Sequence, residues 1–148
     1  MKNGSWLPEL HPRNSTEVIR QMYEMAGEAA GVPVDSLFLP VWYRERNSRT
    51  WLFNGTAVLQ ARAPGLDKPL VVAGLQKRGV HFGSRDEDSA RLVLLIVSGD
   101  TRSQIQLLRD AGRIFRRRET VEKALDATNF VEFAAAINAP ADEREAAA

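Results

Sequence analysis

A polar pair, Gln60 and Arg62, interrupts an otherwise apolar stretch near the middle of the 148-residue sequence. The segments Thr56–Leu59 and Leu70–Leu75 are apolar, and the turn Pro64–Gly65 separates them, so we predict two short strands. The carboxamide of Gln60 donates and accepts hydrogen bonds, but its nitrogen is no nucleophile near pH 7. The sequence therefore predicts a hydrogen-bonding site that lies between two strands.

Nucleophilic and metal-binding side chains are scarce. The sequence has no cysteine and two histidines, His11 and His81, and neither has a second histidine close in sequence with which to form a metal site. The phosphate-binding patterns G-x-x-x-x-G-K-[ST] and G-x-G-x-x-G are both absent. We predict no metal and no cofactor, and we interpret both histidines as ordinary surface or half-buried residues.

Three elements are expected before this site. Residues 5–10 predict an edge strand, because Pro8 cannot donate a hydrogen bond within a sheet. Asn14 and Glu17 form a capping-box pattern at the start of an amphipathic helix that ends at Gly31. Asp35 is the expected cap of a second helix. The inward-facing residues of these two helices are expected to be Val18, Met22, Met25 and Ala29, and then Leu37, Phe38, Val41 and Trp42.

The elements after the site follow a similar logic. Residues 80–82 predict a short strand, and the continuous apolar run Leu92–Val97 predicts the central strand of a sheet covered on both faces. Thr101 and Gln104 fit a capping box that begins a helix, and two short helices are expected over about 121–127 and 130–137, the second capped by Asn129 and Glu132. The core-facing stripe of the first helix is expected to be Ile105, Leu108, Ala111, Gly112 and Phe115.

The length and composition fit a single soluble domain. Hydrophobic residues make up 44% and charged residues 26% of the chain, and the formal net charge is +1. This balance provides no overall field toward nucleic acid or membrane, and neither a signal peptide nor a membrane span is apparent. We predict an α/β domain over residues 1–138, with one mixed sheet flanked by helices, a flexible tail over 139–148, and a cytoplasmic location.

The stretch from Thr50 to Leu75 resembles the active-site region of the enzyme IIA domains of the bacterial phosphotransferase system, of the fructose, mannitol and nitrogen-regulatory type. In that family a pattern S-T-G-I-G-x-G-I-A-I-P-H-A-R is followed by P-G-L-x-K-P-L-V, and its histidine is phosphorylated. The matching positions here are Thr50, Asn54, Gly55, Ala57, Val58, Ala61, Arg62, Pro64, Gly65, Leu66, Lys68, Pro69, Leu70 and Val71. The resemblance places Gln60 at the position of the phosphorylated histidine.

The same resemblance suggests a position for the second family histidine. Aligning the family's H-L-x-L-L with residues 104–108 places Gln104 there, so that both imidazoles would be replaced by amides able to hydrogen-bond each other. The alternative reading is that Gln104 is a helix-capping residue.

Two further residues of the stretch also have two readings. The resemblance makes Arg62 a ligand of phosphate oxygens, whereas an ion pair with a nearby carboxylate such as Asp67 explains it equally well. Thr50 matches a family hydroxyl near the same pocket, but a threonine at such a corner also bonds the local backbone.

A basic cluster follows the helix that begins near Thr101. Arg113, Arg116, Arg117 and Arg118, with Lys123 nearby, suit a helix C-terminus or a docking surface for an acidic protein. Nucleic-acid binding would require a larger basic surface with stacking aromatic residues, so we do not predict it.

Three functions remain open. The first is a regulatory module that has lost phosphotransfer and binds a protein partner, such as a membrane transporter or a signalling kinase, without being embedded in the membrane. The second is an active phosphotransferase component that is phosphorylated on another residue, for which His81 is the candidate. The third is a sensor of a small anion or nucleotide whose pocket is formed by Gln60, Gln104, Arg62 and Thr50.

Overall fold

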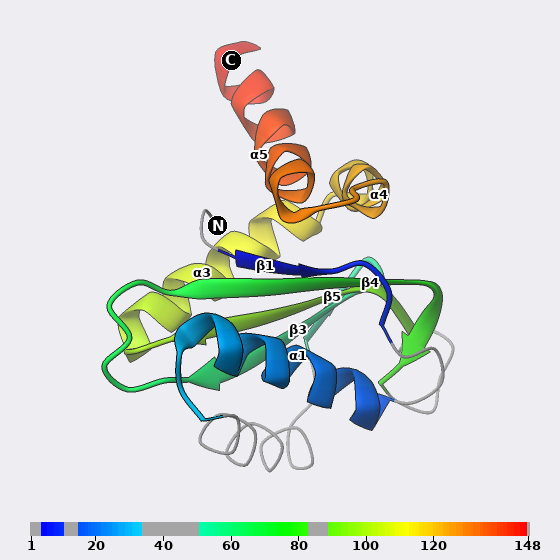
Figure 1. Cartoon of the computed structure of the whole chain (residues 1–148). Helices are drawn as coiled ribbons and strands as arrows, with labels where there is room; N and C mark the ends of the chain where they lie inside the picture. The colour runs from blue at the N-terminus through cyan, green and yellow to red at the C-terminus, as the bar shows by residue number, and fades with distance from the viewer. Residues whose placement is uncertain (1–3, 11–14, 34–50, 83–88, 148) are drawn as a thin grey trace.

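Five strands form one mixed sheet in the order β1-β4-β5-β3-β2 (Figure 1). The structure is a computed structural model that describes residues 4–10, 15–33, 51–82 and 89–147, without the side chains of 51–53 and 139–147. The strands are β1 (Gly4–Leu7), β2 (Trp51–Phe53), β3 (Thr56–Arg62), β4 (Leu70–His81) and β5 (Ser89–Ser98). β5 lies at the centre, parallel to β3 and antiparallel to β4.

The described helices cover both faces of the sheet. They are α1 (Ser15–Ala30), α3 (Thr101–Phe115), α4 (Arg118–Leu125) and α5 (Phe130–Ala147). Figure 1 shows α1 on one face of the sheet and α3, followed by α4 and α5, on the other. The predicted α/β architecture, a single mixed sheet flanked by helices, is confirmed.

The core has two layers, one on each face of the sheet. Val93, Leu95 and Val97 of β5 pack with the buried side of α1, whereas Leu92, Leu94 and Ile96 pack with α3, α4 and α5. Successive side chains of a strand point to opposite faces, so a strand covered on both faces needs an unbroken apolar run. The prediction of Leu92–Val97 as the central buried strand is therefore confirmed.

The strands that carry and flank the polar pair differ from the expected ones. β3 continues through Gln60 to Arg62, so the pair belongs to a strand, and β5 rather than the pair lies between β3 and β4. Residues 80–81 do not begin a new strand but end β4, after an irregularity between Leu75 and Val80 in which Gly79 has a positive φ of 87°. β1 ends at Leu7, directly before Pro8.

Four of the five predicted helices fall within the described residues, and the structure has a helix at each of these places, although several details differ. α1 buries Val18 and Met22 as expected, although Ala29 is exposed. α4 and α5 are both longer than expected, and α5 continues to Ala147. The cap at Asn14 and the helix expected after Asp35 lie outside the described residues, and the flexible tail stays a prediction.

α3 is rotated relative to the expected stripe. Its buried residues are Gln104, Leu107, Ala111 and Phe115, whereas Ile105 is 47% exposed and Leu108 is only partly buried. Its N-cap is Asp100 and not Thr101, because the Asp100 carboxylate accepts the backbone N–H of Ser103 at 2.7 Å. Since the cap is provided by Asp100, the side chain of Gln104 is available for other contacts.

Candidate functional site

The register of the sheet places Gln60 and Arg62 beneath the N-terminal turns of α3. Gln60 pairs with Ile96 and Arg62 with Ser98 in the parallel β3–β5 ladder. Gln60 and Arg62 alternate with Ala57, Leu59 and Ala61, which belong to the core on the α1 side, so their side chains lie on the α3 side. β5 ends at Ser98 and α3 begins at Thr101, so the first turns of the helix lie over this end of β3.

The connection between β5 and α3 is packed closely against the turn that follows Arg62. Ala63 donates its backbone N–H to the carbonyl of Ser98 at 2.9 Å. A Cβ atom at Gly99 would lie 2.4 Å from the carbonyl oxygen of Leu66, so only glycine fits there without a shift of the backbone. This close approach fixes the first turn of α3 relative to the end of β3.

A directed chain of hydrogen bonds joins the three polar side chains. Arg62 donates from Nε to Oε1 of Gln104 at 3.0 Å, and Gln104 donates from Nε2 to Oε1 of Gln60. A guanidinium has no acceptor atom, so Gln104 must turn its oxygen toward Arg62 and its NH₂ toward Gln60. Arg62 therefore sets the orientation of both amides. A second guanidinium nitrogen, Nη2, donates to Oγ1 of Thr101 at 2.5 Å and ties the arginine to the start of α3.

The site is buried at one end and open at the other. Gln104 is only 5% exposed, Gln60 is half-buried, and Arg62 is exposed. The buried amide of Gln104 has both of its polar atoms paired, which offsets the cost of removing them from water. Solvent reaches the network from the Arg62 side.

Asp100 brings a carboxylate close to the same end of α3. Its pKa lies below the ordinary value of 3.8, chiefly because the carboxylate accepts the backbone N–H of Ser103. Further hydrogen bonds from Ser103 and Arg102 and the attraction of Arg62 lower this pKa as well, while partial desolvation opposes them. The open end of the site thus presents a guanidinium with a carboxylate nearby.

Of the other candidate residues, the structure describes Asp67 and His81, and neither joins this network. Arg62 forms no ion pair with Asp67, although the structure describes both side chains. His81 pairs with Ser89 at the start of β5, and Gln60 pairs with Ile96 near its end, so about 23 Å of strand separates them at 3.3 Å per residue. Thr50 and His11 lie outside the described residues.

A contact that the sequence analysis missed holds the other end of α3. Asn54 and Gly55 have φ angles of 50° and 77° and form the two-residue turn between β2 and β3, for which Asn-Gly is a preferred pair. Nδ2 of Asn54 donates to the carbonyl oxygens of Phe115 at 2.9 Å and Arg116 at 2.5 Å. The Asn-Gly pair was a signal for the turn, but nothing local indicated that its side chain would cap a distant helix.

The described part of the chain offers neither a metal site nor a membrane-spanning helix. No group of three or more histidine, cysteine, aspartate or glutamate side chains comes together among the described residues. None of the helices within the described ranges has both the length and the apolar character that crossing a membrane requires.

Comparison with known proteins identifies the family. The family model "Phosphoenolpyruvate-dependent sugar phosphotransferase system, EIIA 2" matches residues 3–139. Among curated protein sequences no relative matches.

Solved structures share the fold at low sequence identity. The crystal structure of IIA mannitol from Escherichia coli is 22% identical, with a TM-score of 0.75 over 89% of this chain and 94% of that one. The nitrogen regulatory protein IIA-Ntr from Neisseria meningitidis is 14% identical, with a TM-score of 0.77 over 90% of this chain and 92% of that one. With a family model that spans nearly all of its residues and a fold that both structures share, this chain belongs to the EIIA type 2 family of the phosphoenolpyruvate-dependent sugar phosphotransferase system.

Proposed function

We propose that this domain is a regulatory module that acts by binding a protein partner and does not carry a phosphoryl group at Gln60. The observation that carries the proposal is the hydrogen bond between the amides of Gln60 and Gln104, which Arg62 orients through its own bond to Gln104. By the resemblance to the family, these two glutamines occupy the positions of the phosphorylated histidine and of a second histidine close to it. The proposal therefore rests on an amide pair where an imidazole pair is expected.

The chemistry of the amide supports the loss of phosphotransfer. A neutral imidazole has a lone-pair nitrogen that attacks a phosphoryl group near pH 7, and a neighbour can hold the proton on its other nitrogen. A carboxamide has no such nitrogen. The arginine and the two amides instead form a hydrogen-bonded unit, which supports a cleft that keeps its shape without its reactive group.

Protein binding is the activity that such a domain can retain. One similar structure is a complex of enzyme IIA mannitol with phosphorylated enzyme IIB mannitol from Escherichia coli, 22% identical with a TM-score of 0.73. That complex supports a protein partner for this chain, and we propose that the partner is a membrane transporter or a signalling kinase. We also propose that this chain is a bacterial protein located in the cytoplasm.

Intact-mass measurement tests this proposal directly. The purified protein is incubated with phosphoenolpyruvate, the general phosphotransferase enzyme and its histidine phosphocarrier, beside a family member that has the histidine. We expect the control to gain a phosphate and this protein to gain none. A phosphate gain that is lost on acid treatment would show a phosphohistidine in this chain and would overturn the proposal.

A second candidate function is recognition of a small anion or nucleotide at the open end of the site. The observation that favours it is Arg62, which is exposed and held in place by Gln104 and Thr101. A guanidinium fixed in this way is suited to phosphate or carboxylate oxygens, although the nearby Asp100 carboxylate opposes an anion. Thermal stabilisation by inorganic phosphate or ATP that disappears in Arg62→Ala would support this function, and stabilisation that persists would indicate another site.

The position of His81 gives no support to phosphorylation there as part of the same site. Its partner in the ladder is at the opposite end of β5 from that of Gln60, and its side chain is exposed. A phosphoryl group on His81 would be far from Arg62 and α3.

A further inference from the structure

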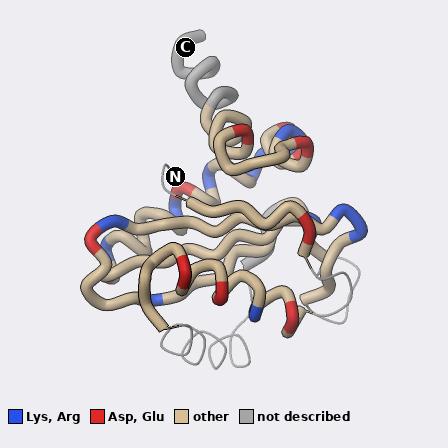
Figure 2. Tube along the Cα trace, viewed as in Figure 1, with Lys and Arg blue, Asp and Glu red and all other residues tan. Residues whose placement is uncertain are grey.

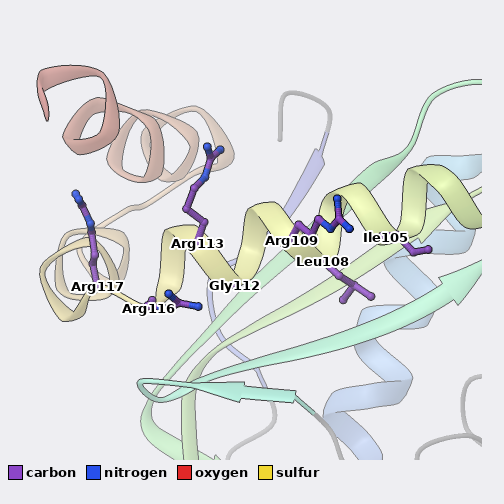
Figure 3. A pocket seen from close by; sticks show the side chains of 7 residues that line it. All are labelled: Ile105, Leu108, Arg109, Gly112, Arg113, Arg116 and Arg117. Carbon is purple, nitrogen blue, oxygen red and sulfur yellow. The ribbon is translucent and has the colours of Figure 1, made fainter. Parts of the chain in front are cut away.

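A groove with an apolar floor and a basic rim runs along the exposed side of α3 (Figure 3). We call it the α3 groove. Its volume is about 710 Å³. The residues that line it are Ile105, Leu108, Arg109, Gly112, Arg113, Arg116 and Arg117. All of them belong to α3 or to the link between α3 and α4.

The floor is an apolar helix face that nothing in the described structure covers completely. Ile105, Leu108 and Gly112 recur at positions i, i+3 and i+7, which lie on one side of a helix. Among the side chains that the structure describes, Ile105 and Val131 are the only large exposed hydrophobic ones. Gly112 has no side chain, so another backbone can approach α3 closely at the centre of the floor.

The rim is strongly and locally positive. Between positions 105 and 118 the chain has five arginines and one carboxylate, Asp110. Asp110 lies 3.6 Å from Arg113. Arg109, Arg116 and Arg117 form no ion pair with any side chain that the structure describes. Among the described side chains, therefore, most of the arginines on the rim have no carboxylate partner.

The acidic side chains of α1 lie on the other side of the sheet from the basic rim of the α3 groove (Figure 1, Figure 2). Figure 2 shows acidic positions along α1, on the opposite side of the sheet from α3. These are Glu17, Glu24 and Glu28, with Arg20 between them. The formal net charge of +1 thus conceals a basic surface on α3, so the weak overall field does not argue against an acidic partner.

Stabilisation of the helix end does not account for the whole cluster. Arginines near a helix C-terminus interact favourably with its dipole. Here, however, the carbonyls of Phe115 and Arg116 are already paired with Asn54. The dipole also gives no reason for an exposed apolar floor beside the arginines. Nucleic acid fits the floor poorly, because none of the described residues that line the groove is aromatic and able to stack on a base.

We propose that the α3 groove binds an acidic amphipathic helix of a partner protein. The apolar side chains of the partner helix lie on Ile105, Leu108 and Gly112. The carboxylates of that helix accept hydrogen bonds from the arginines of the rim. This inference rests on the proposed function as a protein-binding module, and it adds the surface and the chemistry of the partner.

A designed peptide tests the groove without knowledge of the natural partner. The probe is a fluorescent synthetic helix of about 18 residues with leucines on one face and glutamates beside them, and the control peptide has the same composition in scrambled order. Fluorescence anisotropy at about 0.15 M salt measures the dissociation constant, and backbone amide chemical shifts map the contact. We expect the amphipathic peptide to bind and to shift the amides of residues 105–117.

Two variants of the groove separate charge from shape. Arg109→Gln with Arg116→Gln should weaken binding about fivefold, since each exposed charge contributes modestly in water. The matched control, Arg20→Gln with Arg78→Gln, removes the same charge from exposed positions outside the groove and should leave binding unchanged. Gly112→Leu fills the floor without altering charge and should weaken binding about tenfold, while leucine favours the helix over glycine.

Several outcomes would overturn this inference. They are no binding of the amphipathic peptide, equal binding of the scrambled peptide, stronger binding of a short DNA duplex, or self-association of the protein that Gly112→Leu abolishes. None of them affects the phosphorylation experiment, so the groove can fail while the proposed function stands. Conversely, a phosphate gain by a protein that binds the peptide would refute only the loss of phosphotransfer.

Discussion

Gln104 of α3 donates a hydrogen bond to Gln60 of β3 across 44 residues of sequence, and Arg62 determines which way the bond runs. The guanidinium donates to the oxygen of Gln104, which leaves the Gln104 nitrogen to face Gln60. Two glutamines alone could exchange the roles of donor and acceptor by rotating their amides. With Arg62 present, one arrangement satisfies all three groups.

Removing the middle member of this network should destabilise the fold. Gln104→Leu removes the hydrogen bonds of the Gln104 amide to Gln60 and to Nε of Arg62, which should lower the free energy of unfolding by about 1 kcal/mol. Urea denaturation followed by circular dichroism measures this change. Gln106→Leu is the matched control, because Gln106 is exposed on the same helix and its side chain donates a hydrogen bond to the carboxylate of Asp110 at 3.2 Å. Equal effects of the two substitutions would show that the network adds no stability.

Replacing both amides by imidazoles should restore phosphorylation. In Gln60→His alone, the NH₂ of Gln104 still points toward position 60 and competes for the lone pair that would attack the phosphoryl group. Gln60→His with Gln104→His removes that competition. We expect acid-labile phosphate on the double variant, less on the single variant and none on the unaltered protein, as measured by intact mass. If the folded double variant stays unphosphorylated, residues outside this pair also prevent the reaction.

Asn54 should stabilise the fold in two separable ways. Its side chain bonds the end of α3, and its backbone tolerates the positive φ of the turn. Asn54→Gly keeps a residue that tolerates the positive φ of 50° but loses both bonds to the end of α3, and we expect a loss of about 1 kcal/mol in the free energy of unfolding. Asn54→Ala also places a Cβ in the left-handed region without the local hydrogen bonding of asparagine, so its loss should reach about 2 kcal/mol. Thermal and urea unfolding of the two variants provide the comparison. A glycine variant as stable as the original protein would mean that the two bonds contribute nothing.

The pKa of Asp100 predicts a loss of stability in acid. Because its pKa is lower in the folded state than the ordinary value of 3.8, the unfolded chain binds the proton first as pH falls. The contribution of Asp100 is complete above that ordinary value and disappears as pH falls through the lower folded value. Asp100→Asn keeps an N-cap but does not titrate, so the free energy of unfolding should fall less steeply with pH below about 4.

The contribution of Glu132 to the pH dependence of stability must be distinguished from that of Asp100 in that experiment. Its pKa is also lowered, chiefly by the hydrogen bond from the Thr128 hydroxyl and also by the bond from the Thr128 backbone N–H, so it loses its contribution in acid too. Glu132→Gln and the double variant with Asp100→Asn assign the two parts of the slope. An unchanged acid slope in Asp100→Asn would contradict the role given to Asp100.

Local pattern was sufficient to predict the elements whose burial is complete. Every residue of the run Leu92–Val97 is apolar, so neither side of a strand formed by it suits contact with water. Such a run fits a strand that is covered on both faces. The polar pair Gln60 and Arg62 was visible because it breaks such a pattern. The position of Gln104 came from family resemblance, since no local rule relates a helix residue to a strand 44 residues earlier.

The errors concern residues whose environment depends on distant parts of the chain. The stripe of α3 was misplaced mainly because Ile105 was counted as core, whereas it is exposed and lines the α3 groove. Leu108 packs partly against the core and also lines the groove. The capping role assigned to Gln104 was wrong because Asp100 performs it, a competition that the pattern could not decide. The role of Asn54 depends on a contact across 61 residues, which a turn signal does not encode.

α3 is fastened at both ends to a single β-hairpin, by Arg62 and Gln104 at its start and by Asn54 at its end. Neither the helix nor β3 can separate from the other without breaking bonds at both ends of the contact. Their backbone amides should therefore exchange hydrogen with solvent through one shared opening event, with similar protection in α3 and β3. In this respect the helix and the hairpin form one cooperative unit, although about forty residues of chain separate them.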